Sequence, residues 1–193
     1  QRTLLTSLIA GPTLSDVGNS GAAIGDFDQD GDLDLFATGW NGSFMSATVM
    51  QNQGGSQAGT EGTFAASQVI ALGNQFWGRL IPQDLAAGDI DGEGDLDVIE
   101  AGQPGIQIFT NLGGDQGGTL GEFSSDELKI GTGNDAFRTF ALQGGRVSLG
   151  DLDRDGDLDF FVTGRDQSRV PTHGSDTTHG FAAIINQGGA QGG

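Results

Sequence analysis

Short runs of apolar and β-branched residues, bounded by Gly, Asn or Asp, recur along the whole chain. Such runs are typical of β-strands, and no segment keeps a helical period. The pattern therefore predicts an all-β protein. The predicted strands are 22–24, 33–38, 48–50, 67–72, 85–87, 96–100, 106–109, 127–130, 146–149, 158–163 and 182–185.

Three sequence markers divide these strands into repeats. The first is a nine-residue loop with five acidic residues, found at 26–34, 89–97 and 151–159. Successive copies begin 63 and 62 residues apart. The second marker, Asn-x-Gly-Gly, begins at Asn52, Asn111 and Asn186, and a Gly-x-Phe marker follows it at 62–64 and 121–123. Because the markers keep one order, we expect a repeat protein with four strands per unit.

The repeats define the expected domain organisation. We interpret residues 1–193 as one repeat domain with these parts: a strand that completes a unit, 1–10, and three units, 20–72, 83–130 and 145–189. The third unit stops after its third strand, and the apolar N-terminal stretch resembles the missing fourth strand. A polar insertion, 165–179, lengthens the third unit and is expected to form a surface loop.

Charge narrows the classes of function. The formal net charge is −18, and 15 of the 26 acidic residues lie in the three loops. The eight basic residues are spread along the chain, so the sequence shows no cluster of basic residues of the kind that binds nucleic acid. No apolar run approaches the roughly 20 residues that a membrane helix needs, so no membrane insertion is expected. The chain has no Cys, which excludes disulfides and thiolate metal sites.

Five acids in nine residues repel one another unless a cation lies between them. Calcium takes six to eight oxygen ligands, and carboxylates at loop positions one, three, five and nine, with the carbonyl at position seven, can supply them. The expected carboxylate ligands are Asp26, Asp28, Asp30 and Asp34, then Asp89, Asp91, Glu93 and Asp97, then Asp151, Asp153, Asp155 and Asp159. The expected carbonyl ligands are those of Asp32, Asp95 and Asp157. The sequence thus predicts three Ca²⁺ ions, one per repeat.

Other loop positions have expected roles as well. Gly at position six permits a sharp turn. Leu at position eight, which is Leu33, Leu96 or Leu158, is expected to point away from the ion into the core. Glu93 has a longer side chain than Asp, so the second site is expected to differ in geometry or affinity.

The acidic loops have three alternative interpretations besides dedicated calcium sites. An EF-hand needs Glu at position twelve, and only Glu100 meets this requirement, since the other two loops have Ala37 and Val162 there. The flanking segments also have strand patterns. Magnesium is disfavoured because it keeps several waters. Solvated Asp-rich turns without an ion are the remaining alternative.

Few other residues suggest chemistry. His173, Asp176 and His179 have spacing that could bind a transition metal, although two histidines in a polar loop are more often a coincidence. Trp40 and Trp77 could stack on sugars or contact a partner, but packing between repeats is the favoured interpretation. No nucleophile elbow is present and Lys129 is the only lysine, so no catalytic residue is identified and no enzyme is expected.

The Gly-Asp-Phe-Asp-x-Asp-Gly-Asp-Leu-Asp core, the apolar strand after it and the Asn-x-Gly-Gly…Phe tail resemble the FG-GAP/VCBS repeat family. The resemblance spans essentially the whole chain. It implies four-stranded β-propeller blades with one calcium each, as in integrin α chains. Propellers have about four to eight blades, so three blades imply part of a larger propeller or a homo-oligomer, the simplest being a dimer with six blades.

The resemblance also implies a function. It suggests a calcium-binding, non-enzymatic adhesion module, extracellular or on the cell surface, that contacts a protein or glycan ligand. One fold can carry several functions. Two alternatives therefore stay open: a carbohydrate-active propeller, either a lectin or a polysaccharide lyase domain, and a purely structural unit that assembles with itself.

Overall fold

The structure is a computed structural model, which describes residues 21–72, 81–103, 106–128, 142–166 and 179–187. These residues form three antiparallel sheets, and their only helices are two single 3-10 turns, η1 (Gly55–Gln57) and η2 (Gly114–Gln116). The predicted all-β class is confirmed. The proposed strand 1–10 lies outside the described residues.

Each sheet is a meander in which consecutive strands pair. The first sheet contains β1 (Gly21–Gly25), β2 (Asp34–Trp40), β3 (Met45–Asn52) and β4 (Phe64–Ala71). The second contains β5 (Ile81–Gly88), β6 (Asp97–Gln103), β7 (Ile106–Phe109) and β8 (Asp126–Leu128). The third contains β9 (Leu142–Gly150), β10 (Asp159–Asp166) and β11 (His179–Ile184). Every acidic loop therefore joins the first and second strands of a sheet.

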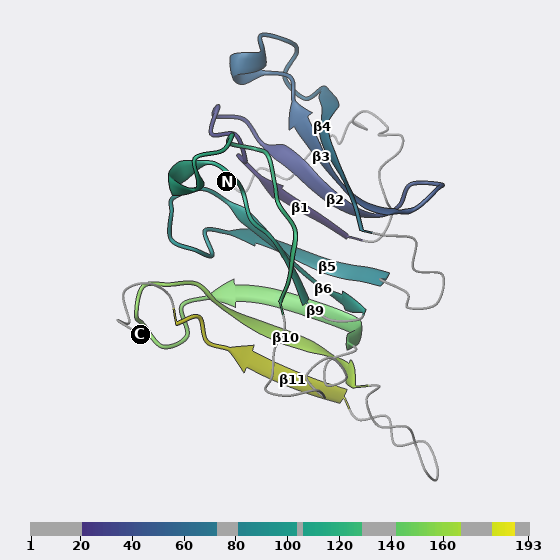
Figure 1. The fold of residues 1–193 in the computed structure, drawn as a ribbon, viewed down its shortest axis with the longest axis vertical. Helices are drawn as coiled ribbons and strands as arrows, with labels where there is room; N and C mark the ends of the chain where they lie inside the picture. The colour runs from purple at the N-terminus through teal and green to yellow at the C-terminus, as the bar shows by residue number, and fades with distance from the viewer. Residues whose placement is uncertain (1–20, 73–80, 104–105, 129–141, 167–178, 188–193) are drawn as a thin grey trace, which may run out of the picture.

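The three sheets follow one another along the long axis of the molecule, with β4 near one end and β11 at the other (Figure 1). Their first strands meet, because β1 lies against β5, and β5 and β6 lie against β9. The strands late in each sheet lie farther from these contacts (Figure 1). The arrangement resembles successive propeller blades, and the described residues show no closed ring.

Two hydrophobic clusters fill the spaces between the sheets. The cluster between the first and second sheets is built around four phenylalanines, Phe27, Phe36, Phe109 and Phe123. The ring centroids in this group lie 4.9–6.3 Å apart in tilted or edge-to-face pairs, which are favourable aromatic geometries. The cluster between the second and third sheets is aliphatic apart from Phe160, and includes Ile99, Ile106 and Val162.

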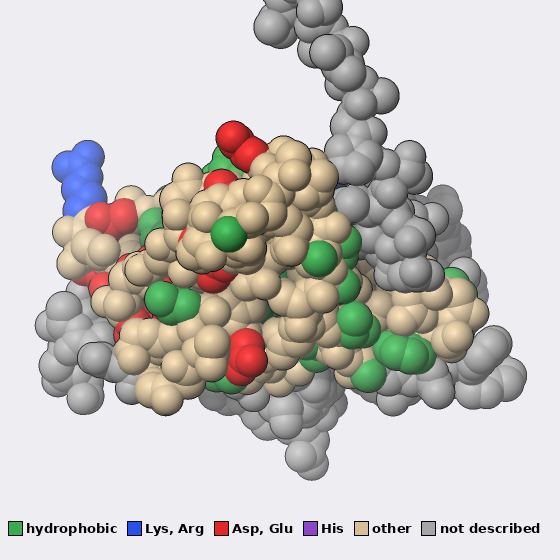
Figure 2. Space-filling view, turned by 90° about the horizontal axis from the view of Figure 1, so that it is seen from above, with side chains coloured by type: hydrophobic (Ala, Val, Ile, Leu, Met, Phe, Trp, Pro, Cys, Tyr) green, Lys and Arg blue, Asp and Glu red, His purple; other side chains and the backbone are tan. Residues whose placement is uncertain are grey.

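The middle sheet is buried on both faces. Val98 belongs to one cluster and its neighbour Ile99 to the other, and both are fully buried. The two outer sheets expose large apolar side chains, including Leu33 and Phe181. The view from the β4 side shows exposed hydrophobic patches beside acidic groups (Figure 2).

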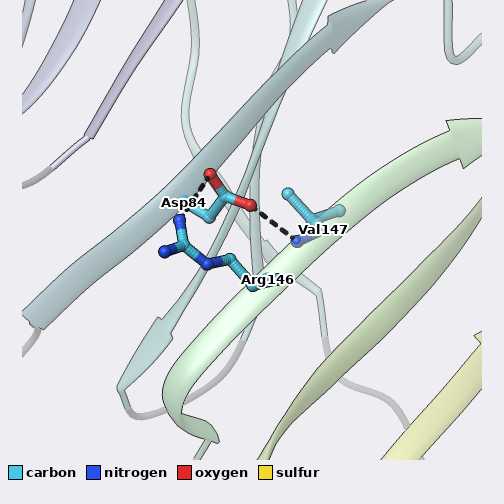
Figure 3. A network of polar contacts seen from close by, with 3 residues as sticks. All are labelled: Asp84, Arg146 and Val147. Atoms are coloured by element: carbon cyan, nitrogen blue, oxygen red, sulfur yellow. Dashed lines mark hydrogen bonds and ion pairs between the residues drawn. The ribbon is translucent and has the colours of Figure 1, made fainter.

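One polar contact also joins the second and third sheets close to their first strands. Asp84 on β5 accepts a hydrogen bond from the backbone N–H of Val147 on β9, at 3.1 Å. The same carboxylate lies 3.5 Å from the guanidinium of Arg146 (Figure 3). Because Asp84 is mostly buried and Arg146 is exposed, the backbone hydrogen bond is the better shielded of the two contacts.

Candidate metal centre

The backbone of each acidic loop turns sharply at position six. Gly31, Gly94 and Gly156 have φ of 99°, 94° and 100°, a left-handed conformation that other residues adopt only with strain. The carboxylate at position one stabilises the turn: Asp26 accepts the N–H groups of Asp30 and Gly31 at 3.0 and 3.1 Å. The glycine at position six is therefore required by the loop geometry, as the sequence predicted.

The turn brings three carboxylates together in every loop. In each case the acids at positions one, three and nine place one ligand atom apiece within 4.8 Å of the other two. The three groups are Asp26, Asp28 and Asp34; Asp89, Asp91 and Asp97; and Asp151, Asp153 and Asp159. Three carboxylates at this separation can share one cation.

The acid at position nine is the buried anchor of the loop. Asp34 is 1% exposed and accepts the N–H of Phe27 at 3.1 Å and that of Asn52 at 2.9 Å. Asp97 makes the same pair of contacts with Ile90 and Asn111. Asp159 repeats the arrangement with Leu152 and Asn186. Each of these carboxylates joins the start of the loop to the end of the third strand, so it holds the sheet as well as facing the site.

The asparagine of the Asn-x-Gly-Gly marker is a second anchor, for which sequence reasoning assigned no role. Asn52 donates from its side chain to the carbonyl of Leu33 at 3.2 Å and accepts the N–H of Gly62 at 2.8 Å. Asn111 makes the same contacts with Leu96 and Gly121. The side chain thus links the acidic loop to the Gly-x-Phe marker. The regular recurrence of this Asn was the signal available in the sequence.

The 3-10 turns supply a further group that the sequence analysis missed. Gln57 at the end of η1 donates to Asp28 at 2.7 Å, and Gln116 at the end of η2 donates to Asp91 at 2.6 Å. Both glutamines lie five residues after the marker Asn. The third repeat has Gln191 at that spacing, outside the described residues. These amides fix the orientation of the acid at position three, as hydrogen-bond donors to metal-binding carboxylates commonly do.

Position seven contributes more than the carbonyl that was expected from it. Both side-chain oxygens of Asp32 and Asp95, and one of Asp157, are buried with no hydrogen-bond partner among the described residues. A Cβ at Gly54 would collide with the Asp32 carboxylate, and a Cβ at Gly113 would lie 2.7 Å from Asp95. The marker glycines therefore make room for these carboxylates beside the site.

Position five lies outside the carboxylate triads. Asp30 accepts hydrogen bonds from the N–H of Asp32 and from the backbone and hydroxyl of Ser56. These hydrogen bonds, with that to Asp32 first among them, lower the pKa of Asp30 below its usual value. Glu93, the counterpart in the second loop, is exposed. Metal ligation by position five, and the distinct behaviour expected of the second loop, stay predictions.

Several acids of the three loops are harder to ionise than ordinary carboxylates. Burial raises the pKa of Asp34 and of Asp97 to about 6 in each case. Burial and then repulsion from neighbouring acids raise the pKa of Asp28, Asp95 and Asp153. A bound cation would offset both effects, since it replaces lost solvation and cancels the repulsion.

These observations fit a hard divalent cation. The loops offer only oxygen, their carboxylates converge, and several buried oxygens at positions one, three and seven have no described hydrogen-bond partner: Asp28, Asp32, Asp89, Asp95 and Asp157. Buried polar atoms normally have partners. Oxygen-rich sites of this kind suit Ca²⁺, which accepts six to eight ligands with flexible geometry. The acids at positions one, three and nine are the residues that would hold it.

The expectation for Leu at position eight was wrong in one loop. Leu96 packs against the first hydrophobic cluster and Leu158 is partly buried, but Leu33 is 59% exposed. The reason is their position in the chain. Leu96 and Leu158 pack on the preceding sheet, and no sheet precedes Leu33 among the described residues.

The remaining sequence candidates do not gather into a site in the described structure. Trp40 ends β2 and is 45% exposed, so it is not buried between sheets. Trp77, His173 and Asp176 lie outside the described residues, and no side-chain position is described for His179. The possible transition-metal site of the 165–179 insertion therefore stays a prediction.

The fold and its loops define an all-β repeat protein with one acidic cluster per repeat. Residues 26–100 match the family model described as an FG-GAP-like repeat. Over these residues the match confirms the resemblance stated from the motifs. No curated protein matches the chain. In the part of the chain that the structure describes, neither helix is long and apolar enough to cross a membrane.

Proposed function

We propose that the chain is a calcium-stabilised, propeller-type binding module without catalytic activity. The repeat family indicates a binding module of this type, and its members are generally non-enzymatic. The observation that carries the calcium assignment is the set of three convergent acidic triads, each next to buried carboxylate oxygens that lack described partners. Calcium would hold each loop closed and so fix the first two strands of each sheet.

We propose further that the module acts outside the cell and contacts a protein or a glycan. Repeats of this family are typically extracellular, which supports an extracellular setting. Extracellular modules bind calcium with Kd of about 10⁻⁴ to 10⁻³ M. A glycan array probed in millimolar calcium separates the two ligand classes, because selective sugar binding would favour a lectin and its absence a protein ligand.

Thermal melting with and without calcium tests the proposed role of the loops. At tenfold excess over Kd, one site stabilises the folded state by about 1.4 kcal/mol, so three sites contribute roughly 4 kcal/mol. We expect the melting midpoint to fall on addition of EGTA and to recover with calcium. Magnesium at the same concentration is the control and should restore little. An unchanged midpoint would contradict a structural role for calcium.

The pH dependence of calcium binding gives a second test. Since burial holds the pKa of Asp34 and Asp97 at about 6 without the ion, protons compete with calcium as the pH falls through that value. Titration calorimetry should show three sites per chain at pH 7.5 and weaker binding at pH 5. Affinity that is the same at both pH values would mean that these acids do not contact the ion.

A further inference from the structure

The two interfaces inside the chain are built from the same contacts. The side chain of Asn111 donates to the carbonyl of Phe27 in the preceding sheet at 2.9 Å. Asn186 donates in the same way to the carbonyl of Ile90 at 2.7 Å. In both cases the marker Asn of one repeat binds position two of the repeat before it. The sheets therefore dock through a repeating hydrogen bond as well as through apolar packing.

A leucine and a glycine form the second repeating contact. The side chain of Leu96 lies against Gly25 of the preceding sheet so closely that a Cβ there would be only 2.8 Å away. Leu158 lies against Gly88 in the same way, also at 2.8 Å. Leu at position eight thus packs on the Gly that precedes the acidic loop of the sheet before it. Gly25 and Gly88 are both buried as a result.

The first sheet presents one half of this interface, and no described sheet supplies the other half. Leu33, the counterpart of Leu96 and Leu158, is 59% exposed. The side-chain amide of Asn52 donates only to Leu33 of its own sheet among the described residues. We call this the leading corner, formed by the exposed Leu33 and by Asn52, which is 6% exposed, beside the first acidic loop.

The third sheet presents the complementary half. Leu152, at position two, is 51% exposed, whereas its counterparts Phe27 and Ile90 are buried. No described atom would lie within 4 Å of a Cβ at Gly150. Phe161, in the place of the buried Phe36 and Ile99, is also exposed and stacks on Phe181 with ring centroids 5.8 Å apart. We call this the trailing corner, formed by Gly150, Leu152 and Phe161.

We infer that the leading corner of one chain docks on the trailing corner of a second copy, head to tail, by the contacts that join the sheets within one chain. Leu33 of the second copy would pack on Gly150, and its Asn52 would donate to the carbonyl of Leu152. Continuity with the two internal interfaces supports this occupant, because a second copy carries the same Leu and Asn at the required spacing. Two copies that dock at both corners would close a six-bladed ring.

Two charge variants test the inference on the full chain in millimolar calcium. Leu33→Glu places a charge on the leading corner, and Leu152→Glu places one on the trailing corner. Both side chains are exposed, so the chain should still fold, which the melting midpoint checks. When two copies of the same variant meet head to tail, the charged corner of one copy faces the unaltered corner of the other, so every interface contains a buried charge. Sedimentation equilibrium should then show a dissociation constant raised by roughly tenfold or more, as for a central contact.

Mixing the two variants makes the test specific. The trailing corner of Leu33→Glu and the leading corner of Leu152→Glu are both intact, so the mixture should recover a dimer through one unaltered interface. Thr119→Glu adds the same charge in an exposed loop of the middle sheet and should dimerise like the wild type. A wild type that stays at the 19.8 kDa monomer mass at high concentration would overturn the inference. Dimerisation of either single variant at wild-type affinity would also overturn it.

Discussion

The middle sheet and the two outer sheets share the same order in their first three strands and the same acidic loops, but they differ in what covers them. At the position two residues after the loop, Phe36 in the first sheet and Ile99 in the second are fully buried, whereas Phe161 in the third is 38% exposed. The residue type does not account for the difference, because the exposed side chain is as large as the buried ones. The presence of a following sheet does.

In a repeat protein, burial therefore depends on neighbouring repeats more than on the residue itself. Among the described strands, those of the first and third sheets pack against the middle sheet, so stability is close to a sum of repeat and interface contributions. A substitution at one repeat position should cost most in the middle sheet and least where a neighbouring sheet is missing. This comparison predicts different effects from equivalent mutations, and the predictions below run from the largest effect to the smallest.

Truncation of the buried side chain in the middle sheet should have the largest effect. Ile99→Ala leaves a cavity between the second and third sheets and should lower the free energy of unfolding by about 2–5 kcal/mol. Phe161→Ala, at the equivalent position, removes a partly exposed ring and should cost less than half as much. Urea unfolding in calcium at low protein concentration measures both. Equal losses would mean that the outer face of the third sheet is covered in solution.

Glu100 provides a pH-dependent test of the middle sheet. It is 4% exposed, and burial raises its pKa from 4.5 to about 7. The unfolded chain releases this proton near pH 4.5 and the folded chain keeps it to about 7. Stability should therefore fall as the pH rises through this window, and the loss, on the order of 3 kcal/mol, should be complete above pH 7.

The matched variant for this effect is Glu100→Gln, which has the same shape and no charge. The free energy of unfolding of this variant should equal that of the wild type near pH 4.5. At pH 8 it should be higher by roughly 3 kcal/mol, with both values measured in saturating calcium. The equivalent residues in the outer sheets are Ala37 and Val162, so no other sheet has a titrating group at this position. A stability difference that stays constant with pH would show that Glu100 is solvated or paired.

The marker asparagines separate contacts within a sheet from contacts between sheets. Asn111→Ala removes hydrogen bonds to its own loop and the one to Phe27 in the first sheet. Asn52→Ala removes the corresponding bonds within its own sheet only. Asn111→Ala should lower the free energy of unfolding by about 1 kcal/mol more than Asn52→Ala does, because one hydrogen bond usually contributes about that much. Chemical unfolding of both variants measures the difference, and equal costs would argue against the bond between sheets.

The sequence alone predicted the strands, their grouping into repeats and the loops that carry the acids. These features are local, since they follow from apolar runs, turn residues and marker spacing. It did not predict that Asp34 anchors the sheet through two backbone N–H groups, or that Asn111 reaches the carbonyl of Phe27. Those contacts join residues far apart in the chain, so only the packing of one sheet on another reveals them.

The exposure of Leu33 is a second feature that the sequence could not predict. Its sequence context matches that of Leu96, and the repeat pattern assigned both to the core. Their surroundings differ because the first sheet has no described predecessor. A repeat motif predicts which side chain faces a neighbouring sheet, and the structure is needed to show whether that sheet exists.

The contacts of Asp84 allow the finest test of how the middle sheet is held. Arg146 is 72% exposed, so Arg146→Ala should change the free energy of unfolding by less than about 1 kcal/mol. Asp84→Ala should cost more, because it also leaves the N–H of Val147 without its acceptor at the contact between β5 and β9. Asp84→Asn is the matched control, since its carbonyl oxygen can still accept that N–H. If Arg146→Ala proves as costly as Asp84→Ala, the ion pair rather than the backbone hydrogen bond joins these two strands.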